Sequence, residues 1–415
     1  MKKNIMRLMA IILACLLLAG CMFRDLLEEI EEEKISFRLY GRVENTAQAE
    51  SHVYVLLYAQ EEGKMQLERF ILPEDTGTYA FLITPGTYMV AGFEDKNNNH
   101  RHDPGEPAGA WGSPDKIVVA EKVETDETKK VLADFDFKLT PGNFPLGNVV
   151  ASVENNANLA SSLVKLGQMA KWDDPAFDQE NADTGFWKPM TFLKEQGNGI
   201  YFMEPFDPDR IPILFVHGAA GTPRAWKALA ESLDPERYQV WVYFYPSGLR
   251  LDLLSTALNK TINRLQADYG FERMGVVAHS MGGLVSRSFI LKHLLEDGKG
   301  TVNVFVSFST PWGGVATAAE GVEHAPEAIP SWYDVDPKSE FIEKIYADSL
   351  KPVIPHYLFF GYRGDCSMFM ANSDGTIEIL SQIDMRAQDD AVFVRGLNED
   401  HMSILESKKS AVYLN

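Results

Sequence analysis

The sequence predicts two folded regions of different class: an α/β domain over residues 206–415 with a mostly parallel sheet, and a small all-β sandwich over residues 35–140. After Arg210, short apolar runs alternate with stretches of helical periodicity, which favours a parallel sheet covered by helices on both faces. Before Thr140, short runs of period-two alternation are separated by Gly, Pro and Asn, which favours a sandwich. A chain of 415 residues, at about 150 residues per domain, has room for two to three domains.

Composition excludes several classes of protein. The hydrophobic share of 45% and the charged share of 24% are those of an ordinary globular chain. The net charge of -20, from 39 basic and 59 acidic side chains, disfavours a nucleic-acid partner. With only Cys15, Cys21 and Cys366, no internal disulfide framework is expected. Nothing in the sequence indicates an oligomeric state.

The N-terminus has the form of a secretory signal over residues 1–20. Lys2, Lys3 and Arg7 precede an uncharged stretch from Leu8 to Gly20, which is shorter than the roughly 20 residues that a membrane-spanning helix needs. The chain is therefore expected to be exported.

The signal ends in Leu18-Ala19-Gly20-Cys21, which resembles the lipobox of bacterial lipoproteins. The resemblance implies cleavage before Cys21, acylation of that cysteine, and anchoring in an outer membrane or at the cell surface. Without residues 1–20 the charge is 36 minus 59, or -23, so acyl chains rather than surface charge would have to hold the protein on a membrane. The acidic stretch within residues 21–34 is expected to be a solvated spacer. The alternative is an ordinary signal peptide with an incidental cysteine.

The coarse element prediction runs through both regions. Residues 141–205 are expected to be a connector with a helix near Leu159 to Trp172. Strands are expected at Phe37 to Val43, Val53 to Tyr58, Gly77 to Ile83, Thr87 to Phe93, Ala133 to Leu139, Ile211 to Val216, Val240 to Tyr245, Met274 to Ala278, Val302 to Phe308, His356 to Gly361 and Ala391 to Arg395. In the second region helices are expected at Pro223 to Leu233, Leu253 to Tyr269 and Gly283 to Leu295. Functional side chains should lie at the carboxyl ends of the parallel strands.

Ser280 is the candidate nucleophile. It lies in Ala278-His279-Ser280-Met281-Gly282, where a predicted strand turns into a predicted helix, the context in which a G-x-S-x-G match is meaningful. The sharp turn requires small residues two before and two after the serine, and Ala278 and Gly282 meet that requirement. The alternative role for Ser280 is a helix N-cap.

An oxyanion hole needs two backbone N–H groups, and the sequence offers both. One would come from Ala219, in the small-residue loop that follows the strand ending at Val216, and the other from Met281. A phosphate-binding loop is the alternative for a glycine-rich turn, but the pattern G-x-x-x-x-G-K-[ST] is absent.

Chain order selects the other two catalytic candidates, since the fold with this turn runs serine, acid, histidine. Of the histidines after Ser280, only His401 follows the last predicted strand by a short loop, which makes it the candidate general base. Asp374, in a turn-rich loop, is the candidate acid, and Asp365 is its competitor. The alternative for His401 is a residue at the start of a short helix.

These residues resemble the α/β-hydrolase family, in particular its bacterial lipase and esterase branch, over about residues 210–410. The matching segments occur in the family's order and are Phe215-Val216-His217-Gly218, Ala278-His279-Ser280-Met281-Gly282-Gly283, Ser309-Thr310-Pro311-Trp312-Gly313-Gly314, Ser373-Asp374-Gly375-Thr376 and His401. The resemblance implies hydrolysis of an ester or lipid through an acyl-enzyme, with no cofactor for catalysis. It also implies a lid over residues 315–355, with Trp332, Tyr333 and Phe341 as apolar lining. The competing function is that of a surface lipoprotein that binds carbohydrate or protein through a catalytically idle hydrolase fold.

The first region carries a candidate calcium loop. Residues 95–106 match D-x-[DN]-x-[DN]-G-x5-E except that His100 stands where the pattern has glycine. The candidate ligands are side-chain oxygens and one backbone carbonyl, from Asp95, Asn97, Asn99, Arg101, Asp103 and Glu106. The alternative is a hairpin turn rich in Asx hydrogen bonds.

Overall fold

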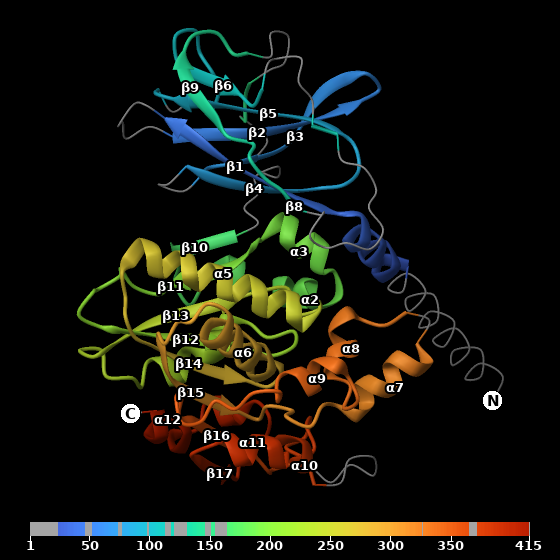
Figure 1. The fold of residues 1–415 in the computed structure, drawn as a ribbon, viewed down its shortest axis with the longest axis vertical. Coiled ribbons are helices and arrows are strands. Elements are labelled where there is room, and N and C mark those ends of the chain that lie inside the picture. Colours follow the sequence, from blue (N-terminus) through green and yellow to red (C-terminus); the bar gives the residue numbers. More distant parts are fainter. Residues whose placement is uncertain are drawn as a thin grey trace, which may run out of the picture. The chain divides into compact units, whose positions relative to one another are not determined.

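The computed structural model describes residues 24–45, 52–73, 77–97, 99–112, 118–119, 131–145, 151–153, 164–325, 327–364 and 372–414. Contacts divide the chain into two compact units (Figure 1). The β unit comprises Glu28–Val164 with Leu193–Gly197, and the α/β unit comprises mainly Lys165–Phe192 and Asn198–Asn415. The predicted signal and Cys21 lie outside the described residues.

The predicted acidic spacer differs from the structure. Residues 24–35 form a helix, and Leu26 and Ile30, four residues apart and therefore on one face, are both buried. The many glutamates of this stretch conceal the apolar pair in the sequence. None of the helices that the structure describes combines the length and the apolar character of a membrane-spanning segment.

The β unit confirms the all-β prediction for the first region. Its described strands are β1 (Phe37–Asn45), β2 (His52–Glu61), β3 (Lys64–Ile71), β4 (Thr78–Ile83), β5 (Thr87–Asp95), β6 (Pro107–Ala110), β7 (Val118–Val119), β8 (Val131–Leu132) and β9 (Phe137–Pro141). They pair in the order β3-β2-β5-β6-β9-β1-β4, with β7 on β5 and β8 on β1. Strand β3 was not predicted, because its charged residues hide the alternation, and a turn with left-handed Glu62 and Gly63 joins it to β2.

Strands β2 and β5 are buried on both faces. On β2, Val55 and Leu57 belong to one apolar cluster while Tyr54 and Leu56 belong to another. The segment after β9 supplies Ala151, Val153 and the ring of Phe144 to the second cluster.

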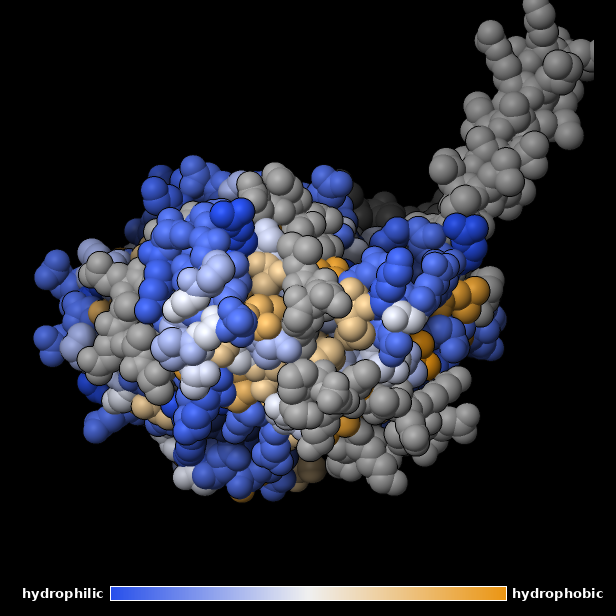
Figure 2. Space-filling model, turned by 90° about the horizontal axis from the view of Figure 1, so that it is seen from above, coloured by the Kyte–Doolittle hydropathy of each residue, from blue (hydrophilic) through white to orange (hydrophobic). Residues whose placement is uncertain are grey.

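Figure 2 shows a face on which hydrophilic side chains surround hydrophobic ones gathered near its middle.

The α/β unit is built on one sheet of eight described strands. They are β10 (Val164–Met169), β11 (Asn198–Phe202), β12 (Ile211–Val216), β13 (Tyr238–Phe244), β14 (Met274–His279), β15 (Val302–Phe308), β16 (His356–Gly361) and β17 (Phe393–Leu397). The order is β10-β11-β13-β12-β14-β15-β16-β17, and Figure 1 shows the strands from β11 to β17 side by side in this order. Strand β11 is antiparallel to β13, and all pairs from β13 to β17 are parallel. This is the α/β-hydrolase fold, as predicted.

The predicted connector over residues 141–205 is in large part a piece of this sheet. The helix expected near Leu159 to Trp172 is wrong, because Val164–Met169 forms β10. A side chain on Gly199 in β11 would meet the backbone of Lys165, so only glycine lets the two strands lie this close. The α/β unit therefore begins about forty residues earlier than the expected boundary at residue 206.

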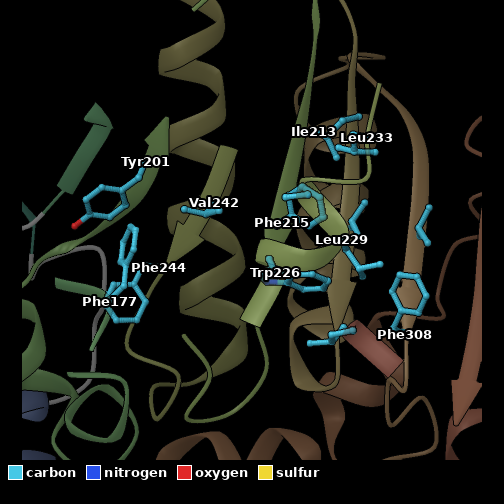
Figure 3. Close-up of a cluster of buried hydrophobic side chains, with 14 of the residues drawn as sticks. Phe177, Tyr201, Ile213, Phe215, Trp226, Leu229, Leu233, Val242, Phe244 and Phe308 are labelled. Carbon is cyan, nitrogen blue, oxygen red and sulfur yellow. The ribbon is translucent and has the colours of Figure 1, made fainter. Parts of the chain in front are cut away.

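Helices cover the sheet. The described helical elements are η3 (Pro175–Phe177), α2 (Gln179–Trp187), α3 (Pro189–Glu195), η4 (Pro223–Trp226), α4 (Lys227–Ala230), α5 (Leu251–Tyr269), α6 (Met281–Leu291), η5 (Lys292–Glu296), α7 (Ala316–His324), α8 (Pro330–Val335), α9 (Glu340–Lys344), α10 (Ile379–Gln382), α11 (Met385–Asp390), η6 (Ser403–Leu405) and α12 (Lys408–Leu414). Figure 3 shows Trp226 on η4 facing Phe215 on β12, with ring centroids 5.1 Å apart. Phe177 packs edge-on against Phe244, so the unpredicted segment before β11 completes this core.

A buried ion pair joins α6 to α11 within the α/β unit. Arg287 Nη1 donates to Asp390 Oδ2 at 2.5 Å, and both side chains are almost fully buried. Arg287 Nε also donates to the Ile345 carbonyl at 2.6 Å, and Asp390 accepts the N–H of Leu350 at 3.0 Å. The helix that begins beside Ser280 is thereby tied to the segment that follows α9 and to α11.

Removing one partner should expose how much the fold depends on this pair. Asp390→Ala leaves the Arg287 guanidinium buried without its counter-charge, and we expect a loss of about 3–5 kcal/mol in the free energy of unfolding. Urea unfolding followed by circular dichroism measures it. Asp389→Ala, at the exposed neighbouring position, should change stability by less than about 0.5 kcal/mol. Equal stabilities of the two variants would contradict a stabilising role for the pair.

Candidate active site

Ser280 lies in a strained turn between β14 and α6. Its backbone has φ 53° and ψ -135°, a conformation that costs energy for any residue except glycine. The Ser280 N–H donates to Phe308 O at 2.9 Å, which anchors the turn to β15. A Cβ on Gly282 would lie 2.2 Å from the His217 carbonyl oxygen, so the position two after the serine has to be glycine. Ser280 occupies the N-cap position of α6, but its side chain makes no capping hydrogen bond.

The Ser280 hydroxyl instead meets His401. The distance from His401 Nε2 to Ser280 Oγ is 3.0 Å, and that from His401 Nδ1 to Asp374 Oδ2 is 2.7 Å. All three residues are buried. The structure thus joins the three residues selected by chain order in one hydrogen-bonded line. The competing acid, Asp365, lies outside the described residues.

The carboxylate of Asp374 is held by its own loop. Its Oδ1 accepts the N–H groups of Thr376 at 3.0 Å and Ile377 at 2.7 Å. Burial alone would raise the pKa of Asp374, but the hydrogen bond and the charge of His401, together with these two N–H groups, outweigh burial and lower it. Asp374 is therefore a carboxylate whose remaining oxygen is directed at the imidazole.

The main chain of His401 is fixed as firmly as its ring. The His401 N–H donates to Asp374 O at 2.9 Å, and the His401 carbonyl lies 2.8 Å from His279 Nε2. Every polar group of His401 therefore has a partner on the loops that carry Ser280 and Asp374.

Gln382 was not identified from the sequence. Its buried amide donates to Ile377 O at 3.0 Å and to Gly361 O at 3.2 Å, and its oxygen accepts the Gly361 N–H at 3.1 Å. The amide thus joins the end of β16 to the loop that carries Asp374. A single glutamine in a sequence has no pattern that would reveal such a role.

The loop after β12 places Ala219 beside the serine. A Cβ on the preceding Gly218 would lie 2.7 Å from Ser280 Cβ, so this backbone approaches the hydroxyl closely. Among the described residues, the Ala219 N–H has no hydrogen-bond partner. Ala220 is left-handed with φ 48°, and its N–H donates to the buried Ser247 Oγ at 2.9 Å. Met281 is the first residue of α6, where the helix leaves its N–H without an internal acceptor.

Other groups hold that loop from behind. The ring of His217 stacks on Tyr245 with centroids 4.2 Å apart, and the Tyr245 hydroxyl donates to His217 O at 2.5 Å. Gln179 on α2 donates to Ala220 O at 2.9 Å, and Thr222 Oγ1 donates to Phe177 O at 2.5 Å. The segment that was expected to be a connector therefore supports the loop that carries Ala219.

Two buried histidines next to the serine stay neutral. Burial lowers the pKa of His217 to about 4. Burial, and then the charge of His401, lower the pKa of His279 to about 3. Neither ring carries a charge near neutral pH. The imidazole within hydrogen-bond distance of the Ser280 hydroxyl is that of His401.

The insertion between β15 and β16 contains α7, α8 and α9. Asp334 ties α8 to the start of α5: it accepts the Leu251 N–H at 2.6 Å and pairs with Arg250 at 2.7 Å. Of the three side chains expected to form an apolar lining, Phe341 is buried in the core, Trp332 is half-buried and Tyr333 is 41% exposed.

In the β unit, the side chains of the candidate calcium ligands form hydrogen bonds within their own loop. Asp95 accepts the N–H groups of Asn99 and His100, and Glu106 accepts those of Lys96 and Asp103. The amides of Asn97 and Asn99 both donate to Asp103 Oδ2 at 2.7 Å.

The Asx turns of the alternative interpretation are present, because Asn97 Oδ1 and Asn99 Oδ1 each accept an N–H two residues on, the second from Arg101. His100 has φ 63°, so it adopts the left-handed backbone conformation at the position where the pattern has glycine. Among the described residues, no group of three or more His, Cys, Asp or Glu side chains is arranged to hold a metal ion.

A family model and several solved structures match parts of the chain. Residues 250–330, which include Ser280, match the family described as "Alpha/beta hydrolase of unknown function (DUF915)". The chain is similar to the solved structure of a Listeria innocua gene product, with 18% identity over 50% of this chain and 92% of that one and a TM-score of 0.39. No curated protein matches the chain.

Two further solved structures are lipases. Bacillus licheniformis lipase BlEst2 in its mature form has 16% identity over 52% of this chain and 96% of that one, with a TM-score of 0.39. Aspergillus fumigatus lipase B has 20% identity over 49% of this chain and 48% of that one, with a TM-score of 0.35. In each of these three structures the likeness covers about half of this chain, and the family match covers residues 250–330.

Proposed function

We propose that this protein is a serine hydrolase that cleaves carboxylic esters, a lipase or esterase. One observation carries the proposal: Ser280, His401 and Asp374, from three loops far apart in the sequence, form a line of hydrogen bonds of 3.0 and 2.7 Å. This is the geometry in which an imidazole activates a hydroxyl.

The mechanism follows from those contacts. Ser280 Oγ attacks the ester carbonyl carbon while its proton passes to His401 Nε2, and Asp374 stabilises the imidazolium and fixes its tautomer. The N–H groups of Ala219 and Met281 donate to the oxyanion of the tetrahedral intermediate. His401 then protonates the departing alcohol. Water, deprotonated by His401, attacks the acyl-enzyme, releases the carboxylic acid and restores the serine.

The substrate class is an ester of a carboxylic acid, with the acyl chain selected by the insertion over residues 315–355. Asp334 holds α8 of this insertion to α5, so a lid motion would have to pivot away from that attachment. Hydrolysis of p-nitrophenyl esters of graded acyl length measures the preference directly.

The decisive test compares two serines of the same region. Ser280→Ala should abolish labelling by a fluorophosphonate and lower kcat by about 10⁴- to 10⁶-fold, since the nucleophile is gone. Ser286 carries a buried hydroxyl on α6 that has no partner among the described residues. Ser286→Ala should therefore keep the labelling and the kcat of the parent. Labelling of the Ser280→Ala protein as strong as that of the parent would contradict the proposal. A parent that neither labels nor hydrolyses any ester would favour the binding protein with an idle fold.

Lipid anchoring is part of the proposal. The support is the resemblance of residues 18–21 to a lipobox, and the helix over residues 24–35 starts only three residues after Cys21. An acyl group on Cys21 would therefore hold the folded chain close to an outer membrane or cell surface.

Cys21→Ser should move the protein from the detergent phase to the aqueous phase in phase partitioning, because the thiol that carries the lipid is missing. Mass spectrometry of the parent should show acyl chains on the mature N-terminus. A parent that partitions like the Cys21→Ser variant would contradict anchoring through this residue.

We also propose that residues 95–106 bind Ca²⁺. The support is that the loop already gathers oxygen acceptors: the side chains of Asn97 and Asn99 donate to the Asp103 carboxylate, and the carboxylates of Asp95 and Glu106 accept backbone N–H groups of the same loop. Bound Ca²⁺ would replace the amide contacts to Asp103 with oxygen ligands.

Calcium should then raise the melting temperature of the protein and a chelator should lower it, because binding to the folded state alone stabilises that state. Asp103→Asn should abolish the shift. A melting temperature that is the same with calcium and with chelator would contradict binding and leave the loop as a hydrogen-bonded turn.

A further inference from the structure

His279, the residue before Ser280, has no part in the proton transfers described above. It is the last residue of β14, only 4% of its surface is exposed, and its ring lies 4.6 Å from that of His401, centroid to centroid. The ring of Trp226 lies edge-on to it at 6.3 Å. The side chain therefore sits between the core and the general base.

The contact between the two histidines has a fixed direction. The partner of His279 Nε2 is the carbonyl oxygen of His401 at 2.8 Å, and a carbonyl can only accept. His279 Nε2 therefore carries the hydrogen and donates it. Because burial keeps this ring neutral, it adds no charge beside the imidazolium that forms on His401 during catalysis.

This hydrogen bond completes a clamp on the backbone of His401. The His401 N–H is held by Asp374 O at 2.9 Å, and the His401 carbonyl is held by His279. The ring position relative to Ser280 Oγ is set by the backbone that carries the ring. Small displacements matter here, since a misplacement of about 1 Å can cost about 100-fold in rate.

We propose that His279 is a positioning residue that places the His401 imidazole by donating a hydrogen bond to its main chain. The inference rests on the proposed serine hydrolase function. It assigns a role to the residue directly before the nucleophile, whose identity the G-x-S-x-G pattern leaves open. It also predicts that the side chain acts through its N–H donor rather than through its ring.

Two substitutions of similar shape separate the donor from the packing. His279→Gln keeps an N–H at a similar reach, whereas His279→Met fills a similar volume without a donor. We expect kcat of the Met variant to fall about 10- to 100-fold while KM stays within about twofold, and the Gln variant to recover most of the loss. If the Met variant fails to fold, the Gln variant decides: kcat within about threefold of the parent supports the role, and any larger loss overturns it.

His356→Met is the matched control. His356 is another fully buried, stacked histidine, 4.6 Å from Phe305 and hydrogen-bonded to Ser307, but it starts β16 at the end of the sheet away from the serine. This variant should lose stability without losing kcat. Equal kcat values for the His279→Met, His279→Gln and parent proteins would overturn the positioning role.

A second readout does not require turnover. The downfield proton resonance of His401 Nδ1–H reports its hydrogen bond to Asp374, and we expect it to broaden in the Met variant and to persist in the Gln variant. An unchanged resonance in the Met variant would contradict the role even in a protein without esterase activity. A parent that is inactive but shows the expected pattern of resonances would place the failure in the proposed function instead.

Discussion

The backbone and ring of His401 form the constraint on which the candidate site depends. Its ring bridges Ser280 and Asp374, while its N–H and carbonyl groups are held by Asp374 and His279. His279 ends β14, Ser280 follows it, Asp374 comes after β16, and His401 itself follows β17. Because these strands are parallel members of one sheet, their carboxyl ends meet at one edge and the loops can be joined there. Displacing any one of the three loops would break contacts to the other two.

Backbone strain is concentrated along the same edge. Ser280 after β14, Ala220 after β12 and Ser309 after β15 all have positive φ, although none is glycine. Close packing maintains these conformations, because a side chain at Gly218 or Gly282 would collide with the neighbouring loop. Such strain persists only where the surrounding structure over-determines it, and here the strained turn presents the Ser280 hydroxyl to His401. The stability of the sheet core is therefore a condition for the geometry of the site.

The sequence supported the buried parallel strands best. Strands β12, β15 and β16 have the predicted bounds. Each is a continuous apolar run between turn residues, which is typical of a strand buried on both faces of a parallel sheet. Chain order then singled out the residues that the structure joins by hydrogen bonds. Long-range pairing was not readable: β10 and β11 are recognisable as sheet members only through their partners.

Supporting residues such as Gln382 and Ser247 were equally invisible, since a buried polar side chain acts through backbone groups that the sequence does not mark. The acidic stretch before β1 shows the opposite error, in which charge concealed an apolar face. Local patterns thus predicted the candidate catalytic residues but not the contacts that hold them.

The structure of the protein after reaction with a phosphonate ester tests the central claim most directly, because the adduct mimics the tetrahedral intermediate. The account predicts phosphorus bonded to Ser280 Oγ, His401 still in contact with Asp374, and a phosphoryl oxygen about 2.7–3.1 Å from the nitrogens of Ala219 and Met281. An adduct on another residue, or a phosphoryl oxygen turned away from both N–H groups, would contradict it.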